Sequence, residues 1–373
     1  MKTTKKNTRL TKRRKKRLEQ IRYGKDLAMG IESLEDRQML AGNVVATITG
    51  AGDLVVRGDA ADNTVAVEVD SVGNVTVTGY DGTTVDDTNL SSTQLSGNIR
   101  ISTFGGDDNV AIYGGDYDIP VENISIVTGS GNDQALIANV DGIDGQVNIN
   151  TGVGNDAATI KYANATGNVT INSGAGSDTN VLNTVTGNDI KINSGADADA
   201  DFVYQTAAVD DMTITSTSGN DTVNIEGVIA ADLNVSTGSG DDQVYITEAH
   251  TKYDTSLTTA GGNDKLVITN SEVTGDLKVN TGAGDDQLCM KYIQSAAEGR
   301  TTVSTGAGND QFEIGEVEIG DSANLNLGGG ADEVAVIGSV VGTGVANGGT
   351  GIDGISDAAN IGGLGLTSFE KYA

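Results

Sequence analysis

The chain has 373 residues, with 52 glycines, one proline, one cysteine and no tryptophan, and its formal net charge is −29. A single cysteine excludes an intramolecular disulfide, and the absence of any run of about 18 apolar residues argues against a membrane-spanning helix. Residues 1–40 hold 13 Lys and Arg against 5 Asp and Glu, whereas the remainder holds 10 against 47, a net charge of −37. This remainder should attract cations and repel nucleic acid and anionic lipid.

The first segment, residues 2–25, is a basic tract rich in Lys and Arg. Such a tract can bind nucleic acid electrostatically, and it can equally be a detachable tail. A secretory signal peptide should follow its basic stretch with about 7–15 apolar residues. Residues 26–32, Asp-Leu-Ala-Met-Gly-Ile-Glu, are too short and too charged for that role, so this pattern alone does not predict export.

Residues 31–41, Ile-Glu-Ser-Leu-Glu-Asp-Arg-Gln-Met-Leu-Ala, resemble the LEPR-XLL sorting segment of large bacterial surface and secreted proteins. Residues 35–37 are Glu-Asp-Arg where the family has Glu-Pro-Arg, and residues 38–40 match its x-Leu-Leu portion with one conservative change. The resemblance implies export and an extracellular or cell-surface location. We expect residues 1–42 to be a leader that packs on nothing and is dispensable for folding.

Residues 43–97 alternate like β-strands, for example in 54–59 and 74–79, but match the later repeat poorly. The end of a solenoid exposes unpaired backbone, so atypical terminal units are expected there. We therefore predict an N-terminal β cap over 43–97.

From residue 98 to residue 356, a turn of the form Gly-x-Gly-Asn/Asp-Asp recurs every 21–25 residues. A period this regular is the signature of a repeat architecture. The final aspartates of the twelve turns are Asp108, Asp133, Asp156, Asp178, Asp199, Asp221, Asp242, Asp264, Asp286, Asp310, Asp332 and Asp353.

Apolar residues alternate with period two on both sides of each turn, which predicts two half-buried strands per unit. The remaining 6–9 residues, often with an isolated Val or Ile, should form a short third strand. We predict an all-β fold, a parallel β-helix (β-solenoid) of about twelve 22-residue rungs over 98–356, with a C-terminal cap over 357–373. The alternative, a β-sandwich array, would need antiparallel alternation on a longer period. The residues expected inside include Val169, Ile171, Leu233, Val235, Leu277 and Val279.

Stacking the rungs about 4.8 Å apart places the turn aspartates in one ladder. Two like charges at that distance repel by about 0.9 kcal/mol in bulk water, so the ladder calls for a neutralising partner. Carboxylates, Asn amides and carbonyls are a ligand set that suits calcium. Asp and Asn also form turns through their own backbone, and water with monovalent ions can screen a ladder, so turns without metal are the alternative. The candidate calcium ligands are Asp108, Asp133, Asp156, Asp178, Asp221, Asp241, Asp242, Asp264, Asp285, Asp286, Asp310 and Asp332.

The stretch 306–312, Gly-Ala-Gly-Asn-Asp-Gln-Phe, resembles the calcium-binding RTX repeat, Gly-Gly-x-Gly-x-Asp-x-(apolar)-x, from the second glycine onward. In that family the aspartates and turn carbonyls hold calcium between successive turns, and the resemblance implies that role here. RTX motifs recur every nine residues, whereas these turns recur about every 22, and Thr or Ser commonly replaces the first glycine. As a whole, the chain resembles bacterial β-strand-repeat surface proteins that carry the same N-terminal segment.

The sequence offers few of the residues that catalytic sites require. Nucleophilic catalysis would have to use His250 or Cys289, the only copies of each, and zinc would need a His/Cys cluster. We expect Cys289 on an outward strand position and His250 in a connection between rungs.

Polysaccharide lyases also use parallel β-helices with calcium, but basic residues are scattered here and tryptophan is lacking. Outward Thr and Ser could order water or bind ice, although regular Thr columns are not sustained.

We therefore predict a non-enzymatic, exported structural or adhesive repeat protein of the cell surface or matrix that binds calcium along its aspartate ladder. Cell-envelope or matrix components are further candidate partners, and nucleic acid is not expected. The alternatives are a plain structural solenoid without metal and a calcium-dependent β-helix enzyme that acts on polysaccharide.

Overall fold

The computed structural model describes residues 42–88, 90, 94–115, 119, 121–295, 299–337, 340–351, 353–356 and 364–369. The chain divides into two units, Met1–Ala41 and Gly42–Ala373, and the description below concerns the second. The leader predicted for 1–42 falls almost wholly outside the described residues, as does most of the predicted C-terminal cap. No helix in the described ranges is long and apolar enough to cross a membrane.

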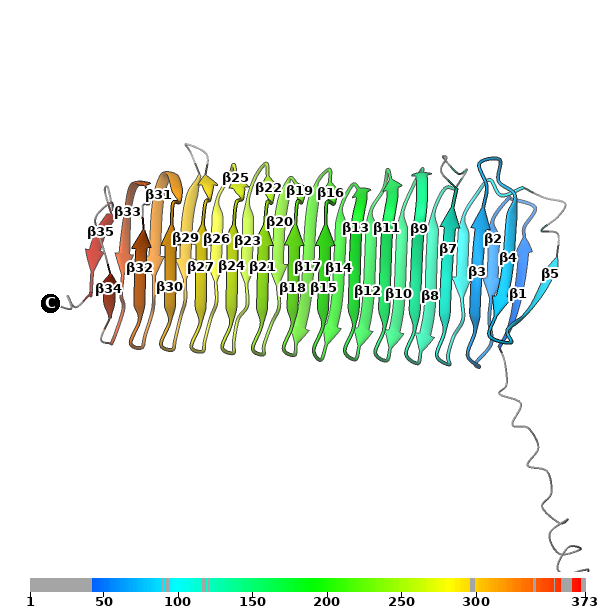
Figure 1. The fold of residues 1–373 in the computed structure, drawn as a ribbon, viewed down its shortest axis with the longest axis horizontal. Helices are drawn as coiled ribbons and strands as arrows, with labels where there is room; N and C mark the ends of the chain where they lie inside the picture. The colour runs from blue at the N-terminus through cyan, green and yellow to red at the C-terminus, as the bar shows by residue number, and fades with distance from the viewer. Residues whose placement is uncertain are drawn as a thin grey trace, which may run out of the picture. The chain divides into compact units, whose positions relative to one another are not determined.

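The second unit is a parallel β-solenoid in which each coil contributes one strand before the turn and one after it (Figure 1). We call these two walls face A and face B. The strands of face A are β2 (Leu54–Arg57), β6 (Ile99–Ser102), β8 (Ile124–Ser130), β10 (Val147–Val153), β12 (Val169–Ala175), β14 (Ile190–Ala196), β17 (Asp211–Ser218), β20 (Asp232–Ser236), β23 (Thr255–Thr258), β26 (Leu277–Asn280), β29 (Arg300–Ser304), β31 (Glu318–Asn326), β33 (Val340–Asn347) and β35 (Leu364–Thr367).

Face B follows the turns and pairs in the same way. Its strands are β3 (Thr64–Val69), β7 (Asn109–Gly114), β9 (Gln134–Ile143), β11 (Ala157–Ala165), β13 (Thr179–Gly187), β15 (Ala200–Tyr204), β18 (Thr222–Glu226), β21 (Gln243–Thr247), β24 (Lys265–Thr269), β27 (Gln287–Lys291), β30 (Gln311–Gly315), β32 (Glu333–Ile337) and β34 (Gly354–Ser356). The predicted short third strand also forms, as β16 (Ala207–Ala208), β19 (Ile229–Ala230), β22 (His250–Thr251), β25 (Glu272–Val273) and β28 (Gln294–Ser295).

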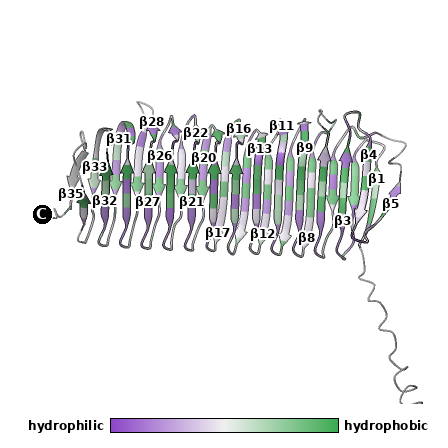
Figure 2. Ribbon diagram, viewed as in Figure 1, coloured by the Kyte–Doolittle hydropathy of each residue, from purple (hydrophilic) through white to green (hydrophobic). Residues whose placement is uncertain are grey.

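The register joins equivalent residues of successive coils in parallel, as in Val169 with Ile190 and Leu233 with Thr255. The predicted all-β parallel solenoid is therefore confirmed, and the antiparallel sandwich is excluded. The six residues expected inside are all 3% exposed or less. Figure 2 shows the hydrophobic and hydrophilic residues alternating along the strands, as two half-buried walls require.

Antiparallel hairpins close the N-terminal end. β1 (Asn43–Ile48) pairs antiparallel with β2, and β4 (Val75–Tyr80) pairs antiparallel with β3. β5 (Thr84–Thr88) runs parallel to β1. β2 and β3 already pair in parallel with β6 and β7, so the regular coil begins inside 43–97. These hairpins cover an edge that would otherwise expose unpaired backbone.

A second corner lies six residues after most of the turn aspartates, where the backbone takes a left-handed conformation. The φ angle is 51° at Asn270 and 55° at Tyr292. Asn tolerates this region better than most residues, whereas a tyrosine there carries local strain. The equivalent residues are Asn139, Tyr162, Thr184, Gln205, Gly227, Glu248 and Glu316.

Candidate functional site: the stacked aspartate turns

The two glycines of each turn are required by the close approach of the preceding coil. Gly282 and Gly284 have φ angles of 98° and 141°. A Cβ on Gly282 would lie 1.6 Å from the carbonyl oxygen of Ala260, and one on Gly284 would lie 1.7 Å from that of Gly262. Between them, the N–H of Ala283 donates to the Ala260 carbonyl at 2.9 Å. The turn backbone is therefore hydrogen-bonded from coil to coil.

The last residue of each turn forms an inner ladder of twelve buried aspartates, each 4% exposed or less. Each backbone N–H donates to the Oδ1 atom of the aspartate in the following coil, as from Asp264 to Asp286 at 2.8 Å and from Asp286 to Asp310 at 2.9 Å. Eleven such bonds join the twelve coils. They begin at Asp108, Asp133, Asp156, Asp178, Asp199, Asp221, Asp242, Asp264, Asp286, Asp310 and Asp332.

The residue just before each inner aspartate forms an exposed outer ladder whose hydrogen bonds run the opposite way. The N–H of Asn309 donates to Oδ1 of Asp285 in the preceding coil at 2.7 Å, and the N–H of Ala331 donates to Oδ1 of Asn309 at 2.9 Å. Most coils are thus bonded to both neighbours through adjacent residues, and the series of outer bonds is interrupted at Ser177 and Ala198. The side-chain acceptors of the outer ladder are Asp62, Asp107, Asn132, Asn155, Asn220, Asp241, Asn263, Asp285 and Asn309.

Ten of the twelve candidate calcium ligands lie in the inner ladder, whereas Asp241 and Asp285 are exposed in the outer one. Asp199 and Asp353 also belong to the inner ladder, although they were not among the candidate ligands. Asp199 follows Asp197-Ala198, a departure from the turn motif. The regular spacing of Asp199 from the neighbouring turn aspartates indicates that it belongs to the inner ladder.

The second oxygen of the inner aspartates has no hydrogen-bond donor. In eleven of the twelve, Oδ2 is buried without a partner, the exception being Asp199, which Ser216 Oγ reaches at 3.5 Å. A buried charged oxygen without a donor is costly. The inner ladder therefore needs a neutralising partner or a neutral carboxyl.

A column of buried Thr and Ser hydroxyls runs beside the inner ladder, five residues before ten of the twelve aspartates. The Thr259 hydroxyl donates to the Thr281 carbonyl at 3.2 Å, and the Thr281 hydroxyl donates to the Thr305 carbonyl at 3.2 Å. A hydroxyl has one proton, so these oxygens present lone pairs to the neighbouring carboxyl. A protonated aspartate, donating from Oδ2, would satisfy both groups. The column consists of Thr103, Thr128, Thr151, Ser173, Ser194, Ser216, Thr237, Thr259, Thr281 and Thr305.

Burial raises the pKa of the inner-ladder carboxyls. The pKa reaches about 6 at Asp108, Asp242, Asp286 and Asp332, with desolvation the largest cause and neighbouring ladder aspartates adding to it. The hydrogen bond that Oδ1 accepts from a backbone N–H opposes the rise.

Two inner aspartates, Asp178 and Asp199, lie near a further buried acid, Asp201. Burial raises the pKa of Asp178 and Asp199 to about 7. Of the column hydroxyls beside them, Ser173 donates to Asn180 Oδ1 at 2.7 Å and Ser194 donates to Asp201 Oδ1 at 2.8 Å. The nearby Asp201 carboxylate adds repulsion. These two carboxyls are therefore the most readily protonated of the ladder.

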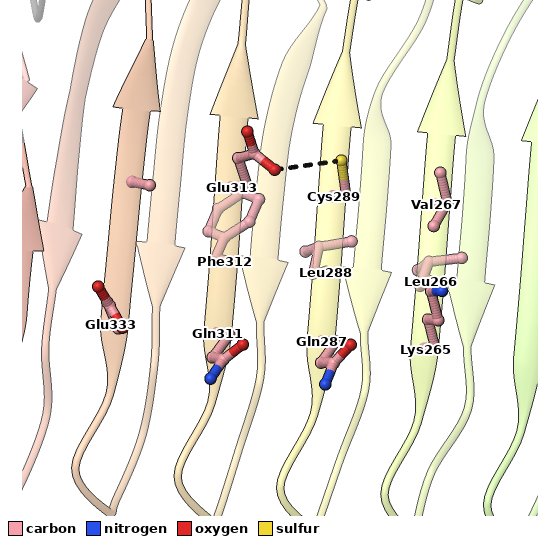
Figure 3. Close-up of a pocket in the computed structure, with 11 residues that line it drawn as sticks. Lys265, Leu266, Val267, Gln287, Leu288, Cys289, Gln311, Phe312, Glu313 and Glu333 are labelled. Carbon is pink, nitrogen blue, oxygen red and sulfur yellow. Dashed lines mark hydrogen bonds between the residues drawn. The ribbon is translucent and has the colours of Figure 1, made fainter.

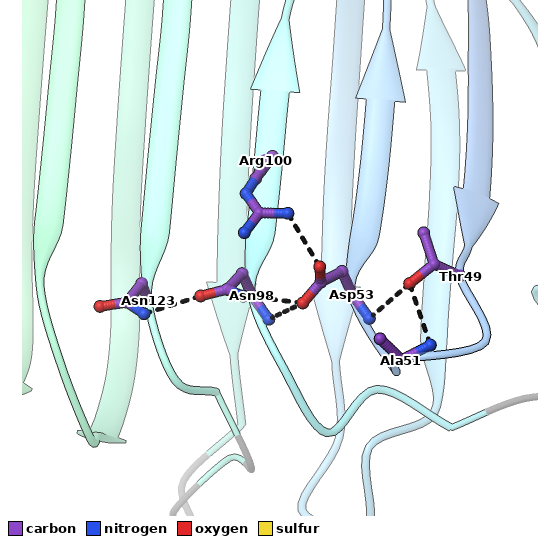
Figure 4. Close-up of polar contacts among 6 residues, drawn as sticks. All are labelled: Thr49, Ala51, Asp53, Asn98, Arg100 and Asn123. Atoms are coloured by element: carbon purple, nitrogen blue, oxygen red, sulfur yellow. Dashed lines mark hydrogen bonds and ion pairs between the residues drawn. The ribbon is translucent and has the colours of Figure 1, made fainter.

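At a different corner, the half-buried Asp53 is paired with the guanidinium of Arg100 (Figure 4). Asn123 donates to Asn98 at 2.7 Å, Asn98 donates to Asp53 Oδ1 at 2.7 Å, and Arg100 pairs with Asp53 Oδ2 at 2.8 Å. Hydrogen bonds from Asn98 and the Arg100 guanidinium lower the pKa of Asp53. Five ion pairs are found among the described residues, and none of them uses an inner-ladder carboxylate.

Calcium takes about six to eight oxygen ligands. The orphan Oδ2 atoms of the inner ladder would suit a cation. The rest of the expected ligand set is engaged, because Oδ1 and the turn carbonyls accept hydrogen bonds from neighbouring coils. In the part of the chain that the structure describes, no group of three or more His, Cys, Asp or Glu side chains is arranged to hold a metal ion. The geometry thus does not supply a calcium site as it stands, and calcium binding stays a prediction from the resemblance.

A depression of about 300 Å³ lies on face B around Cys289, Gln287 and Gln311 (Figure 3). Cys289 occupies the same outward position as Val267 in the neighbouring coil, as expected. Its thiol donates to Glu313 Oε2 at 3.8 Å, and desolvation is the main cause that raises the thiol pKa. A raised pKa disfavours the nucleophilic thiolate.

Comparisons of the chain with protein-family models, with characterised proteins and with solved structures find no match.

Proposed function

We propose that this chain is a structural or adhesive module of the cell surface or extracellular matrix. The proposal rests on the contacts that the repeated turn makes between successive coils. The glycines of the turn permit close stacking, and its last two residues bond most coils to both neighbours, as Asn309 does to Asp285 and Asp310 to Asp332. The most repeated residues of the chain therefore build a continuous stack, which suits a spacer or scaffold.

Export and calcium binding belong to this proposal. Export is supported by the resemblance of residues 31–41 to a bacterial sorting segment. Calcium is supported by the orphan Oδ2 atoms of the inner ladder and by the resemblance of the turns to RTX repeats. A solenoid without metal is the second candidate, because the inner ladder bonds to itself through Oδ1.

Cell-surface exposure tests the proposal. Intact cells that make the chain would be treated with protease or with an antibody against residues 42–369, beside cells opened before treatment and a known internal protein as control. We expect cleavage and labelling without lysis. Labelling that requires lysis would contradict a surface role.

A deletion variant tests the role of the sorting segment in export separately from the stability of the solenoid. Deletion of residues 31–41 should abolish surface labelling and leave the melting temperature of the purified chain unchanged. Surface labelling that survives the deletion would remove the support that the resemblance gives to export.

A further inference from the structure

The two central outward columns of face A carry no acidic residue across the eleven strands from β6 to β31. Each strand presents two outward residues, one on either side of the core residue equivalent to Ile171, such as Thr170 and Asn172. Three of these residues are basic, Arg100, Lys191 and Lys278. Apart from Val127, all the others are Asn, Ser or Thr, and none is aromatic.

The rest of the coil does not share this composition. The outward positions of face B include Glu226, Glu313 and Glu333. The outward column one step earlier along face A carries acids, such as Asp211 and Asp232 at the starts of β17 and β20 and the exposed Asp254. In a body that holds 47 acidic residues, two adjacent columns without any form a distinct strip of the wall. Depletion of charge is the compositional mark of an interface core.

We infer that face A docks a second copy of this chain, wall against wall. Eleven strands at about 4.8 Å spacing span about 50 Å, and two outward columns cover a width of about 13 Å. The wall thus offers about 700 Å² per copy, close to the roughly 800 Å² per partner of a standard stable interface. The inference rests on the proposed structural role and names the partner of one face.

Charge favours a second copy as the occupant. Two bodies with a net charge of −37 each repel one another, so they can meet only where neither places carboxylates opposite the other. Three basic side chains over eleven strands are too few for a polyanion, and a sugar polymer would meet no aromatic ring.

Hydrogen bonds already hold several side chains of face A in place before any partner binds. Asn193 Nδ2 donates to Asn172 Oδ1 at 2.6 Å, and Thr215 Oγ1 donates to Asn193 Oδ1 at 2.7 Å. Stacked Asn side chains at this repeat occur between paired sheets, where small polar residues interdigitate. Little side-chain entropy remains to be lost when two such walls meet.

Sedimentation velocity of the full chain over a range of concentration and salt tests the inference. We expect dimerisation that strengthens as ionic strength rises to about 0.15 M, because salt screens the repulsion between the two bodies. The triple variant Asn172→Asp, Asn234→Asp, Asn280→Asp adds three carboxylates to face A in nearly unchanged shape. Its dissociation constant should rise at least about 100-fold, since like charges placed opposite one another oppose docking.

The triple variant Gln243→Glu, Gln287→Glu, Gln311→Glu is the matched control, since it adds the same charge to outward positions of face B. It should dimerise nearly as the unmodified chain does, and equal melting temperatures of the two variants would show that both fold. An unmodified chain that stays monomeric throughout would overturn the inference and leave face A to another occupant. Equal weakening in both variants would also overturn it, because net charge and not face A would be responsible. Association is measured on purified chain and location on cells, so the inference and the proposed function fail separately.

Discussion

Asn63 occupies in the first coil the position that Asp108 occupies in the second. Thr64 pairs in register with Asn109, and the backbone N–H and Nδ2 of Asn63 donate to Asp108 Oδ1 at 2.8 and 3.1 Å. Both side chains are buried. A neutral amide therefore already occupies the first inner-ladder position without a charge, and its Nδ2 supplies a donor that a carboxylate lacks.

The first prediction follows from this equivalence. Replacing Asp264, Asp286 and Asp310 by Asn keeps the Oδ1 acceptor and supplies a donor where Oδ2 has none. We expect the variant to melt at the same temperature or higher at neutral pH in chelator, because three buried carboxyls no longer repel one another. Differential scanning calorimetry measures this directly.

Alanine at the same position is the contrasting variant. Asp286→Ala leaves the buried N–H of Asp264 without its acceptor, which costs about 1–3 kcal/mol. If the Asn variant were destabilised as much as the Ala variant, the carboxyl charge itself would be stabilising and the interpretation would be wrong.

The second prediction concerns pH. Folding raises the pKa of inner-ladder carboxyls from 3.8 to about 6 at Asp286 and about 7 at Asp178. The folded state then binds more protons than the unfolded state between about pH 4 and pH 7, so the free energy of unfolding should fall as pH rises through this window. The acids that face the ladder from neighbouring segments, Asp107, Asp197, Asp201, Asp241 and Asp285, reinforce the direction.

Denaturant unfolding at several pH values checks this slope. The triple Asn variant should show a shallower decline, because it lacks three of the titrating groups. The half-buried Asp53 and Asp276 act in the opposite sense, since their lowered pKa values give stability that is lost only as pH falls below about 4. A free energy of unfolding that rises steadily from pH 4 to pH 7 would show that the inner carboxyls are ionised in the folded chain.

The solenoid itself could be predicted from sequence because period-two alternation and a 22-residue spacing leave few ways to bury both walls. Val169 and Ile171 had to face the same interior as Leu277 and Val279. The direction of the ladder bonds could not be predicted. Asn309 and Asp310 are adjacent and chemically alike, and only the turn conformation decides which side chain points inward.

Two further features, the buried hydroxyl column and the second corner, could not be predicted from the sequence. In the sequence, the Thr and Ser residues of the buried column, such as Thr281, stand where RTX repeats have their first glycine, and the pattern does not distinguish a turn residue from an inward one. The second corner uses left-handed residues as different as Asn270 and Tyr292. No shared side chain marks it, so its position depends on the strands that flank it.

The third prediction concerns calcium. The proposed calcium should bind through the orphan Oδ2 atoms of the inner ladder, because the turn carbonyls and Oδ1 atoms are engaged between coils. We expect the melting temperature in calcium to exceed that in chelator, since binding to the folded chain alone would add about 2.7 kcal/mol at a hundredfold excess over Kd. Calorimetry would detect this rise, and the triple Asn variant should lose it. Equal melting temperatures in calcium and in chelator would contradict calcium binding and leave a solenoid without metal.

The last prediction uses two adjacent glycines of one turn. Gly262 has a φ angle of 137°, and a Cβ there would lie 1.9 Å from the carbonyl oxygen of Gly240 in the preceding coil. Gly261 has nothing closer to its Cβ position than the Ala283 carbonyl oxygen at 3.8 Å. Gly262→Ala should therefore lower the free energy of unfolding by about 3 kcal/mol or more, because it combines backbone strain with a clash against backbone that cannot move aside.

Gly261→Ala should be neutral or stabilising by about 0.4–1 kcal/mol, since it restricts the unfolded chain without strain in the folded one. The equivalent residue is already alanine in the next two coils, at Ala283 and Ala307. Chemical denaturation of the two variants beside the unmodified chain makes the comparison at one turn and with one added methyl group. Similar stabilities of the two variants would mean that the coils do not approach as closely as the stacked glycines indicate, and the coil-to-coil ladders would lose their geometric basis.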